Sequence, residues 1–321
     1  MLVRTDSGAL ELESVQRVLV IKHGAFGDII QAQGSMRDIR ESFPKARIAV
    51  LTEPCFSKIW QKCPYVDEII TDARAPRWRL DIMWQLRSKL LAFDPQYVVD
   101  LQNSARSACY RRFLLPGPKW SFVDKARSAH AKFPKSMPSL ERKAGQLRDS
   151  GLMHQHTLQP DISWIANDVS KIRRNEGVKK PFVALIPGCS ARHPHKRWPY
   201  YRELALALLN DGYDVVTAPG PDELDLCAQI PGTMLTGGKF LDWFDLAGVL
   251  QQAEYVVGND SGPTHIAAHL DRPGLALFGS HTKARATSIG SRKLDVIEVD
   301  DLKDLEVETV LSRVREALSA N

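Results

Sequence analysis

The stretch Val257-Gly-Asn-Asp-Ser-Gly-Pro-Thr-His-Ile-Ala-Ala-His269 indicates a strand, a polar turn and a helix in the second half of the chain. The apolar run Tyr255–Val257 predicts a buried strand, and Pro263 is favoured in a helix's first turn. Such a turn presents free backbone N–H groups to a phosphate. A phosphate repels Asp260, so we expect this carboxylate to bind neutral groups such as sugar hydroxyls. The alternative is a plain turn in which Asp260 or Ser261 caps the helix.

A second strand–turn–helix pattern lies near the N-terminus. The run Val18–Lys22 predicts a strand, and an amphipathic segment over 28–42 predicts a helix. The spacing of Gly24 and Gly27 does not complete the G-x-G-x-x-G fingerprint of dinucleotide sites. Asp28 follows the carboxyl end of the strand, where open α/β sheets place ligands. It is therefore a candidate general base, with a simple helix N-cap as the alternative.

A third segment combines a strand with a basic loop. The run Phe182–Ile186 predicts a buried strand, and the loop after it carries Arg192, Lys196 and Arg197 before a helix that begins near Trp198. Three cations in one loop are either a solvated surface or the counter-charge for a diphosphate.

Together these three segments resemble the bacterial heptosyltransferases (glycosyltransferase family nine), which build the inner core of lipopolysaccharide, and the resemblance covers nearly the whole chain. Lys-His-Gly-Ala-Phe-Gly-Asp-Ile-Ile at 22–30 is similar to the family's Gly-Asp-hydrophobic motif and places Asp28 on its catalytic base. His-Lys-Arg-Trp-Pro at 195–199 resembles its K-x-W-P motif, with Lys196 on the lysine that holds the donor diphosphate. Gly-Asn-Asp-Ser-Gly-Pro-Thr-His at 258–265 resembles its D-[ST]-G-x-x-H motif, in which the Asp contacts the donor sugar and the following amides contact phosphate.

A fourth motif and one departure complete the resemblance. Gly220-Pro-Asp-Glu223 resembles the family's G-x-x-E stretch, whose glutamate binds the ribose of the nucleotide. Gly24-Ala-Phe stands where the family commonly has Ser-Ser-Leu, so the turn beside the base differs. The resemblance implies these site residues: Asp28 for catalysis; Lys196, Ser190, Ser261 and Gly262 for the donor diphosphate; Asp260 and His265 for the donor sugar; and Glu223, Gly220 and Leu241 for the nucleotide.

The length of 321 residues exceeds what a single hydrophobic core normally supports, and strands alternate with helices along the chain. We expect domains at 1–165 and 166–321, with the polar stretch 151–181 as linker. The resemblance implies the GT-B fold, in which two Rossmann-like parallel-sheet domains face each other across a cleft. It also implies the possibility that the last helix packs back on the first domain. The predicted strands are 18–22, 47–51, 68–70, 97–100, 182–186, 214–218, 233–235, 255–257 and 275–278; the predicted helices are 28–42, 80–91, 199–210, 222–230, 241–251 and 305–319.

Charge is spread unevenly. Residues 1–160 hold 25 basic and 16 acidic side chains, whereas the remainder holds 18 and 22. Within 103–135 eight basic residues accompany one acid, and Trp120, Phe122 and Phe133 lie among them. Such a segment could bind nucleic acid, rest on an anionic membrane with an acidic glycolipid, or be a solvated face. The resemblance favours the glycolipid over nucleic acid, with Arg106, Arg111 and Arg112 as acceptor-binding residues.

Several other classes of protein are disfavoured. The first sixteen residues carry three acids and no sustained apolar run, so we expect no signal peptide, and no stretch is long enough to span a bilayer. The five scattered cysteines indicate reduced thiols. His265 and His269 have metal-ligand spacing, but no glutamate follows His265, so the zinc-protease motif fails. No Asp-x-Asp motif is present, and we expect neither a metal nor a cofactor.

The sequence therefore predicts an inverting, metal-independent glycosyltransferase that moves a heptose from a nucleotide diphosphate donor, expected to be ADP-heptose, to an anionic glycolipid. By resemblance it would be a cytoplasmic monomer in peripheral contact with the inner membrane. Two alternatives remain open: a nucleotide-sugar epimerase on the same fold, and a non-catalytic nucleotide-binding scaffold at the membrane.

Overall fold

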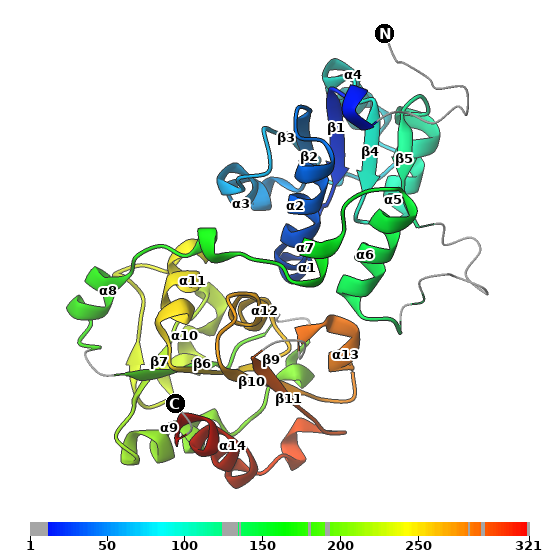
Figure 1. Ribbon diagram of the computed structural model, residues 1–321. Helices are drawn as coiled ribbons and strands as arrows, with labels where there is room; N and C mark the ends of the chain where they lie inside the picture. Colours follow the sequence, from blue (N-terminus) through cyan, green and yellow to red (C-terminus); the bar gives the residue numbers. More distant parts are fainter. Residues whose placement is uncertain are drawn as a thin grey trace. The chain divides into compact units, whose positions relative to one another are not determined.

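The computed structural model (Figure 1) describes residues 12–123, 134, 136–178, 181–189, 193–281, 283–289 and 293–319. The chain divides into two compact units, Met1–Asp161 and Ile162–Asn321. Each unit has its own sheet, with strand order β3-β2-β1-β4-β5 in the first and β11-β10-β9-β6-β7-β8 in the second. Every recorded strand pair is parallel. The predicted α/β class, with two parallel-sheet domains, is confirmed.

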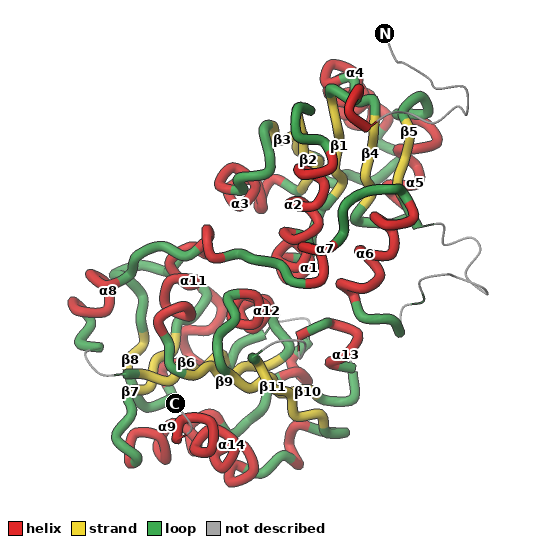
Figure 2. Tube along the Cα trace, viewed as in Figure 1, coloured by secondary structure: helices red, strands yellow, loops and turns green. Residues whose placement is uncertain are grey.

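The first unit contains β1 (Arg17–Ile21), α1 (Phe26–Gln31), α2 (Gln33–Ser42), β2 (Arg47–Thr52), α3 (Ser57–Lys62), β3 (Glu68–Thr71), α4 (Leu80–Phe93), β4 (Tyr97–Asp100), α5 (Ala105–Cys109), the π-helical turn η3 (Tyr110–Leu114), β5 (Lys119–Ser121), α6 (Ser139–Asp149) and α7 (Gln155–Leu158). The second contains α8 (Ser170–Asn175), β6 (Phe182–Ile186), α9 (Tyr201–Asn210), β7 (Asp214–Thr217), α10 (Leu224–Ala228), β8 (Thr233–Met234), α11 (Trp243–Gln252), β9 (Tyr255–Asn259), α12 (Gly262–His269), β10 (Gly274–Phe278), α13 (Ala284–Thr287), β11 (Leu294–Glu298) and α14 (Val307–Ser319). Figure 2 shows these elements along the chain.

Both sheets are covered on two faces, which explains why their central strands are continuous apolar runs. In the first unit, Leu19 and Ile21 of β1 pack in a core to which α4 contributes Met83, Leu86 and Leu90. Val18 and Val20, on the opposite face of the same strand, are also fully buried. Alternate residues of each strand therefore enter different helix layers.

The last helix, α14, belongs to the core of the second unit. Val310, Leu311 and Val314 are buried there with Tyr201 and Leu204 of α9, and α9 and α14 lie on one face of the second sheet while α11 and α12 lie on the other (Figure 1). The apolar stripe of this helix is thus used in the core of the second unit, and packing on the first domain, which the resemblance implies as a possibility, stays a prediction.

The stretch 151–181 is not a free linker, although its polar composition predicts one. Its first part, α7, packs on α2, where the Asp38 carboxylate accepts hydrogen bonds from the backbone N–H groups of His156 and Thr157 at 3.1 and 2.6 Å. A Cβ atom on Gly34 would lie 2.0 Å from the carbonyl oxygen of His156, so this approach requires glycine. The division between the units falls after Asp161.

Candidate functional site

Asp28 lies in the first turn of α1, at the carboxyl end of β1. The N-cap position of this helix is Ala25, so the alternative that Asp28 is the N-cap is wrong. Its side chain is 49% exposed, and one carboxylate oxygen lies 3.5 Å from Nζ of Lys22. A partly exposed carboxylate beside a cation, at the carboxyl edge of a parallel sheet, is placed as a general base requires.

Two buried lysines lie around this carboxylate. Lys22 is only 3% exposed, and its Nζ donates to the carbonyl of Gly24 at 3.2 Å. Burial lowers the pKa of Lys22, and Asp28 opposes that shift. Lys143 of α6 is also buried; burial and the positive charge of Lys22 lower its pKa to about 7, while Asp28 acts to raise it. The first unit thus holds two buried amino groups, and the negative charge of Asp28 favours the protonated form of each. The sequence analysis did not identify either lysine as part of a site.

Lys143 is fixed by polar side chains. Its Nζ donates to Oγ of Ser139 at 2.6 Å and to Oε1 of Gln31 at 3.2 Å. Ser139 also donates to Gln31 at 2.7 Å. Gln31 is in α1, three residues beyond Asp28, so this triad ties α6 to the helix that carries the candidate base.

Arg106 is committed to a structural ion pair. Its guanidinium makes a two-pronged contact with the buried Asp72 at 2.9 and 3.0 Å and donates to the carbonyl of Ala75 at 2.7 Å. Tyr110 donates to the same carboxylate, and His23 Nε2 lies 3.5 Å from it. Burial acts to raise the pKa of Asp72, but the contacts from His23, Arg106 and Tyr110 hold it well below its usual range. The network fixes the loop after β3 against α5.

Arg111 and Arg112 occupy the turn η3. The guanidinium carbon of Arg111 lies 3.5 Å from the ring centroid of Phe122, and that of Arg112 lies 5.3 Å from the ring centroid of Phe113. Arg112 and Phe113 are exposed. Most of the remaining basic segment, residues 124–133 and Lys135, lies outside the described residues.

In the second unit, Asp260 and Lys196 are brought together from separate motifs. Lys196 Nζ lies 2.6 Å from Oδ2 of Asp260, with side chains that are 20% and 8% exposed. Asp260 follows β9 and Lys196 follows β6, which are neighbours in the sheet. The structure therefore shows that these two residues are in contact, which the two motifs in the sequence could not establish.

Asn259, which the sequence reasoning did not single out, holds the basic loop in place. Its side-chain nitrogen donates to the carbonyl of Pro187 at 2.9 Å, and its oxygen accepts from the backbone N–H of Trp198 at 3.1 Å and from Tyr201 at 3.2 Å. One buried amide thus fixes both ends of the loop that carries Lys196. The part of this loop that includes Ser190 and Arg192 lies outside the described residues.

The turn before α12 has the geometry expected of an anion site. Ser261 occupies the N-cap position with extended backbone and no side-chain capping bond, and Gly262 is the first helical residue. Thr264 donates from Oγ1 to the carbonyl of Asn259 at 2.6 Å, which closes the turn. The first-turn N–H groups of an eight-residue helix therefore lie directly after Asp260. The interpretation of Asp260 as a simple cap is not supported, because its carboxylate pairs with Lys196.

One histidine approaches the same carboxylate, and a second lies against the ring of the first. His281 follows β10, and its Nε2 lies 3.5 Å from Oδ2 of Asp260. Its ring lies 5.2 Å from that of His195. Burial and the charge of Lys196 lower the pKa of His281, against the opposite effect of Asp260. His265 is buried in α12 with its ring stacked 6.3 Å from that of His269.

The predicted nucleotide residues lie on loops of the second unit. Oε2 of Glu223 accepts from the backbone N–H of Gly220 at 3.1 Å. A Cβ atom on Gly188 would lie 1.8 Å from Oε1 of Glu223, so the turn after β6 packs directly on this carboxylate. Leu241 is half-buried in the loop before α11, where a Cβ atom on Gly237 would lie 3.2 Å from its Cδ2. The loops after β6, β7 and β9, three adjacent strands, therefore carry Lys196, Glu223 and Asp260, whereas Leu241 lies in the loop after β8.

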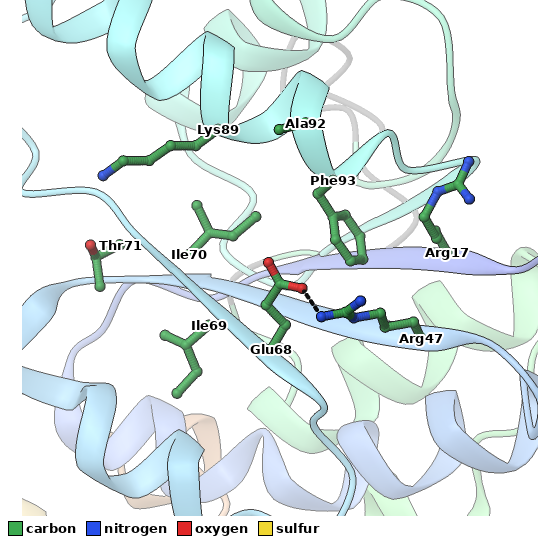
Figure 3. Close-up of a pocket in the computed structure, with 9 residues that line it drawn as sticks. All are labelled: Arg17, Arg47, Glu68, Ile69, Ile70, Thr71, Lys89, Ala92 and Phe93. Carbon is green, nitrogen blue, oxygen red and sulfur yellow. Dashed lines mark ion pairs between the residues drawn. The ribbon is translucent and has the colours of Figure 1, made fainter.

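Neither of two other features among the described residues belongs to this site. Asp38, Glu41 and His156 have metal-ligand spacing, but Asp38 already accepts from the backbone of α7 and Glu41 pairs with Arg37 at 2.9 Å. A groove of about 530 Å³ (Figure 3) lies between the edge strand β3 and α4. Its lining includes the Arg47–Glu68 ion pair but none of the predicted site residues.

Comparison with known proteins identifies relatives over most of the chain. The sequence model of glycosyltransferase family 9 (heptosyltransferase) matches residues 83–313. Lipopolysaccharide heptosyltransferase 2 of Salmonella typhimurium strain LT2 is 28% identical over 294 residues, which cover 82% of each chain. The crystal structure of the glycosyl transferase family 9 from Veillonella parvula DSM 2008 matches with a TM-score of 0.78 at 17% identity, covering 98% and 99% of the two chains. E. coli heptosyltransferase WaaC with ADP-2-deoxy-2-fluoro heptose matches with a TM-score of 0.71 at 20% identity, covering 94% and 99%.

Proposed function

This chain belongs to glycosyltransferase family 9, the heptosyltransferases, and from that premise we propose that it transfers heptose from ADP-heptose to a lipopolysaccharide core acceptor with inversion and without a metal ion. The glycosyltransferase activity and the GT-B fold follow from the family and its solved relatives. The donor is proposed because one of those relatives is described with an ADP-heptose analogue. The acceptor is proposed because a second relative is a lipopolysaccharide heptosyltransferase.

The observation that carries the proposal is the Lys196–Asp260 ion pair beside the first turn of α12. Lys196 and the N–H groups of Ser261 and Gly262 supply positive charge for a departing diphosphate, and Asp260 supplies a hydroxyl acceptor for the donor sugar. Glu223 would bind the ribose. Electrostatic stabilisation of the leaving group is usually the largest single contribution to such a reaction.

In the proposed reaction, Asp28 removes the proton of an acceptor hydroxyl. The oxygen then attacks the anomeric carbon from the face opposite the diphosphate, the bond between that carbon and the phosphate oxygen breaks, and the nucleoside diphosphate leaves. Base catalysis of this kind contributes ~10²–10⁴ in rate. The side chain of Asp28 is half exposed, which leaves it accessible to an acceptor.

The Asp28→Asn variant tests the proposal. It keeps the shape of the side chain but removes the basic carboxylate, so transfer from ADP-heptose to a heptose-free core acceptor should fall by ~10²–10⁴ with unchanged ADP affinity and melting temperature. Asp149→Asn, an exposed charge loss on α6 of the same unit, is the matched control. Retained transfer in a folded Asp28→Asn protein would remove Asp28 from the mechanism.

Two further measurements separate the alternatives. Incubation with ADP-heptose alone should leave the sugar unchanged, whereas an epimerase would convert it without an acceptor. Absence of both conversion and transfer, with ADP still bound, would indicate the non-catalytic scaffold. Transfer that persists in EDTA, with a product of opposite anomeric configuration to the donor, would support the inverting, metal-independent reaction.

A further inference from the structure

Helix α4 carries two apolar stripes, and only one of them is covered. Met83, Leu86, Leu90 and Phe93 are buried against the first sheet. A second stripe, at positions i, i+4, i+7 and i+11, consists of Leu80, Trp84, Arg87 and Leu91. Leu80 is 65% exposed, Trp84 62% and Leu91 44%. Trp78, just before the helix, is 79% exposed, the highest value among the exposed large hydrophobic side chains that the structure describes.

Basic side chains accompany this second stripe. Residues 74–91 include five arginines or lysines and one acid, Asp81. Asp81 is already paired with Arg79 at 2.8 Å. The guanidinium of Arg87 lies 5.4 Å from the ring centroid of Trp84, so cation and ring share one surface. We name Arg77, Trp78, Leu80, Trp84, Arg87 and Leu91 the α4 surface.

The α4 surface is held on a rigid part of the first unit. It begins in the loop after β3, whose carboxyl end lies at the same edge of the sheet as the turn that leads from β1 to Asp28. Arg106 anchors this loop through Asp72 and the carbonyl of Ala75. The exposed tryptophan Trp78 is therefore presented by a loop whose base is pinned by a buried ion pair.

We propose that the α4 surface docks on a bilayer that contains anionic lipids, with Trp78, Leu80 and Trp84 inserted at the level of the headgroups. The inference rests on the proposed function, whose acceptor is a glycolipid. Tryptophan prefers the interface between hydrocarbon and water, and arginine beside it is attracted to anionic headgroups. Long arginine side chains keep their charge among the headgroups while their stems cover apolar surface.

The charge of the surface argues for lipid over a second copy of this chain. In a symmetric dimer the α4 surface would meet itself, so two patches with an excess of two positive charges each, from Arg77 and Arg87, would be brought together. An anionic bilayer instead neutralises that excess. The described part of the segment 103–135 offers one comparably exposed aromatic side chain, Phe113, whereas the α4 surface offers Trp78 and Trp84 together with Leu80.

Flotation of the full-length protein with vesicles, in the absence of donor and acceptor, tests the inference. Vesicles of phosphatidylcholine with 30% phosphatidylglycerol should bind the protein at least tenfold more strongly than phosphatidylcholine alone. Trp78→Ser/Trp84→Ser should weaken binding to the anionic vesicles by about tenfold or more. Arg77→Gln/Arg87→Gln should weaken it by roughly thirtyfold at low salt, since each charge near such a surface is worth about 1 kcal/mol. Trp243→Ser, which removes an exposed tryptophan of the second unit, is the matched control and should bind as the wild type.

Wild-type binding by both double variants would overturn the inference, as would equal binding to neutral vesicles. A dimer in vesicle-free solution that the tryptophan variant dissolves, measured by sedimentation velocity, would assign the surface to self-association instead. A wild-type melting temperature and circular dichroism spectrum for each variant show that it is folded. Because vesicle binding is measured without substrates, its loss or retention is independent of whether the proposed transfer reaction is correct.

Discussion

Replacing Lys143 by methionine should stabilise the first unit, by an amount that shrinks as the pH rises. Lys143 is buried, and its pKa is lowered to about 7 from an ordinary value of 10.5. Above pH 10.5 the amine is neutral in both the folded and the unfolded chain, so folding costs nothing on its account. As the pH falls towards 7 the unfolded chain takes up a proton that the folded chain does not, and the folded state is progressively penalised.

The size of the effect follows from that interval. A difference of roughly 3.5 pKa units at about 1.4 kcal/mol each amounts to a penalty of about 5 kcal/mol at pH 7 and below. Methionine removes the penalty but loses the hydrogen bonds to Ser139 and Gln31, worth about 1 kcal/mol each. Ser139 and Gln31 remain hydrogen-bonded to each other, so neither is left unsatisfied. The expected net gain is about 3 kcal/mol at pH 7 and close to zero at pH 9.

Hydrogen exchange, measured by mass spectrometry at increasing urea concentrations, reports on the stability of each unit separately. Peptides from α1 and α6 should show the increase in unfolding free energy, and those from α9 and α14 should not. The exposed Lys45, replaced by methionine in the same unit, controls for the substitution itself. A gain that is the same at pH 7 and pH 9, or a loss of stability at pH 7, would refute the reasoning, because it would mean that Lys143 is charged and well solvated in the folded protein.

Two other outcomes are expected. Lys196→Ala should weaken ADP binding, and Lys196→Ala/Asp260→Asn should recover part of the lost affinity, because the double variant leaves no buried carboxylate without its partner. Calorimetric titration with ADP measures both affinities, and wild-type affinity in the single variant would exclude Lys196 from the diphosphate site. Asp72→Asn should destabilise the first unit by about 3–5 kcal/mol above pH 4, because it leaves the Arg106 guanidinium without its carboxylate partner. The difference from wild type should shrink below pH 4, where the unfolded chain takes up a proton at Asp72 that the folded chain does not. Urea unfolding at pH 7 and pH 3 checks this, and a difference independent of pH would contradict it.

The central strands could be predicted from the sequence because each is an apolar run between turn residues, and β4 and β6 have the predicted bounds. The two strands that sequence reasoning missed, β5 and β11, lie at sheet edges. Lys119 and Glu298 are exposed on them, so they lack the apolar run that marks a strand buried on both faces. The predicted helix over 28–42 is two helices that break at Ala32, whose residue type gives no signal for a break.

The residues of the candidate site likewise divide into those that the sequence predicts and those that only the structure identifies. Asp28, Lys196 and Asp260 were found because each follows a strand in a recognisable local pattern. Lys143 was missed because its partner Gln31 lies 112 residues away. No local sequence pattern distinguishes a buried lysine at a helix contact from a solvated one. The same holds for Asn259, whose hydrogen-bond partners Trp198 and Pro187 lie 61 and 72 residues away in the sequence.

The Lys196–Asp260 contact resolves a difficulty that the sequence alone raises. A carboxylate next to a diphosphate site should repel the donor, yet Asp260 lies directly before the amides that would bind phosphate. In the free protein its charge is balanced by Lys196 at 2.6 Å, so neither group is buried without a partner. When a diphosphate takes the lysine as its counter-ion, Asp260 needs new donors, and the hydroxyls of the attached sugar can supply them. A nucleoside diphosphate without its sugar would leave the buried carboxylate short of donors. On this argument Asp260 favours the intact donor over the product, and replacing it by asparagine should bring the affinities for ADP and ADP-heptose closer together.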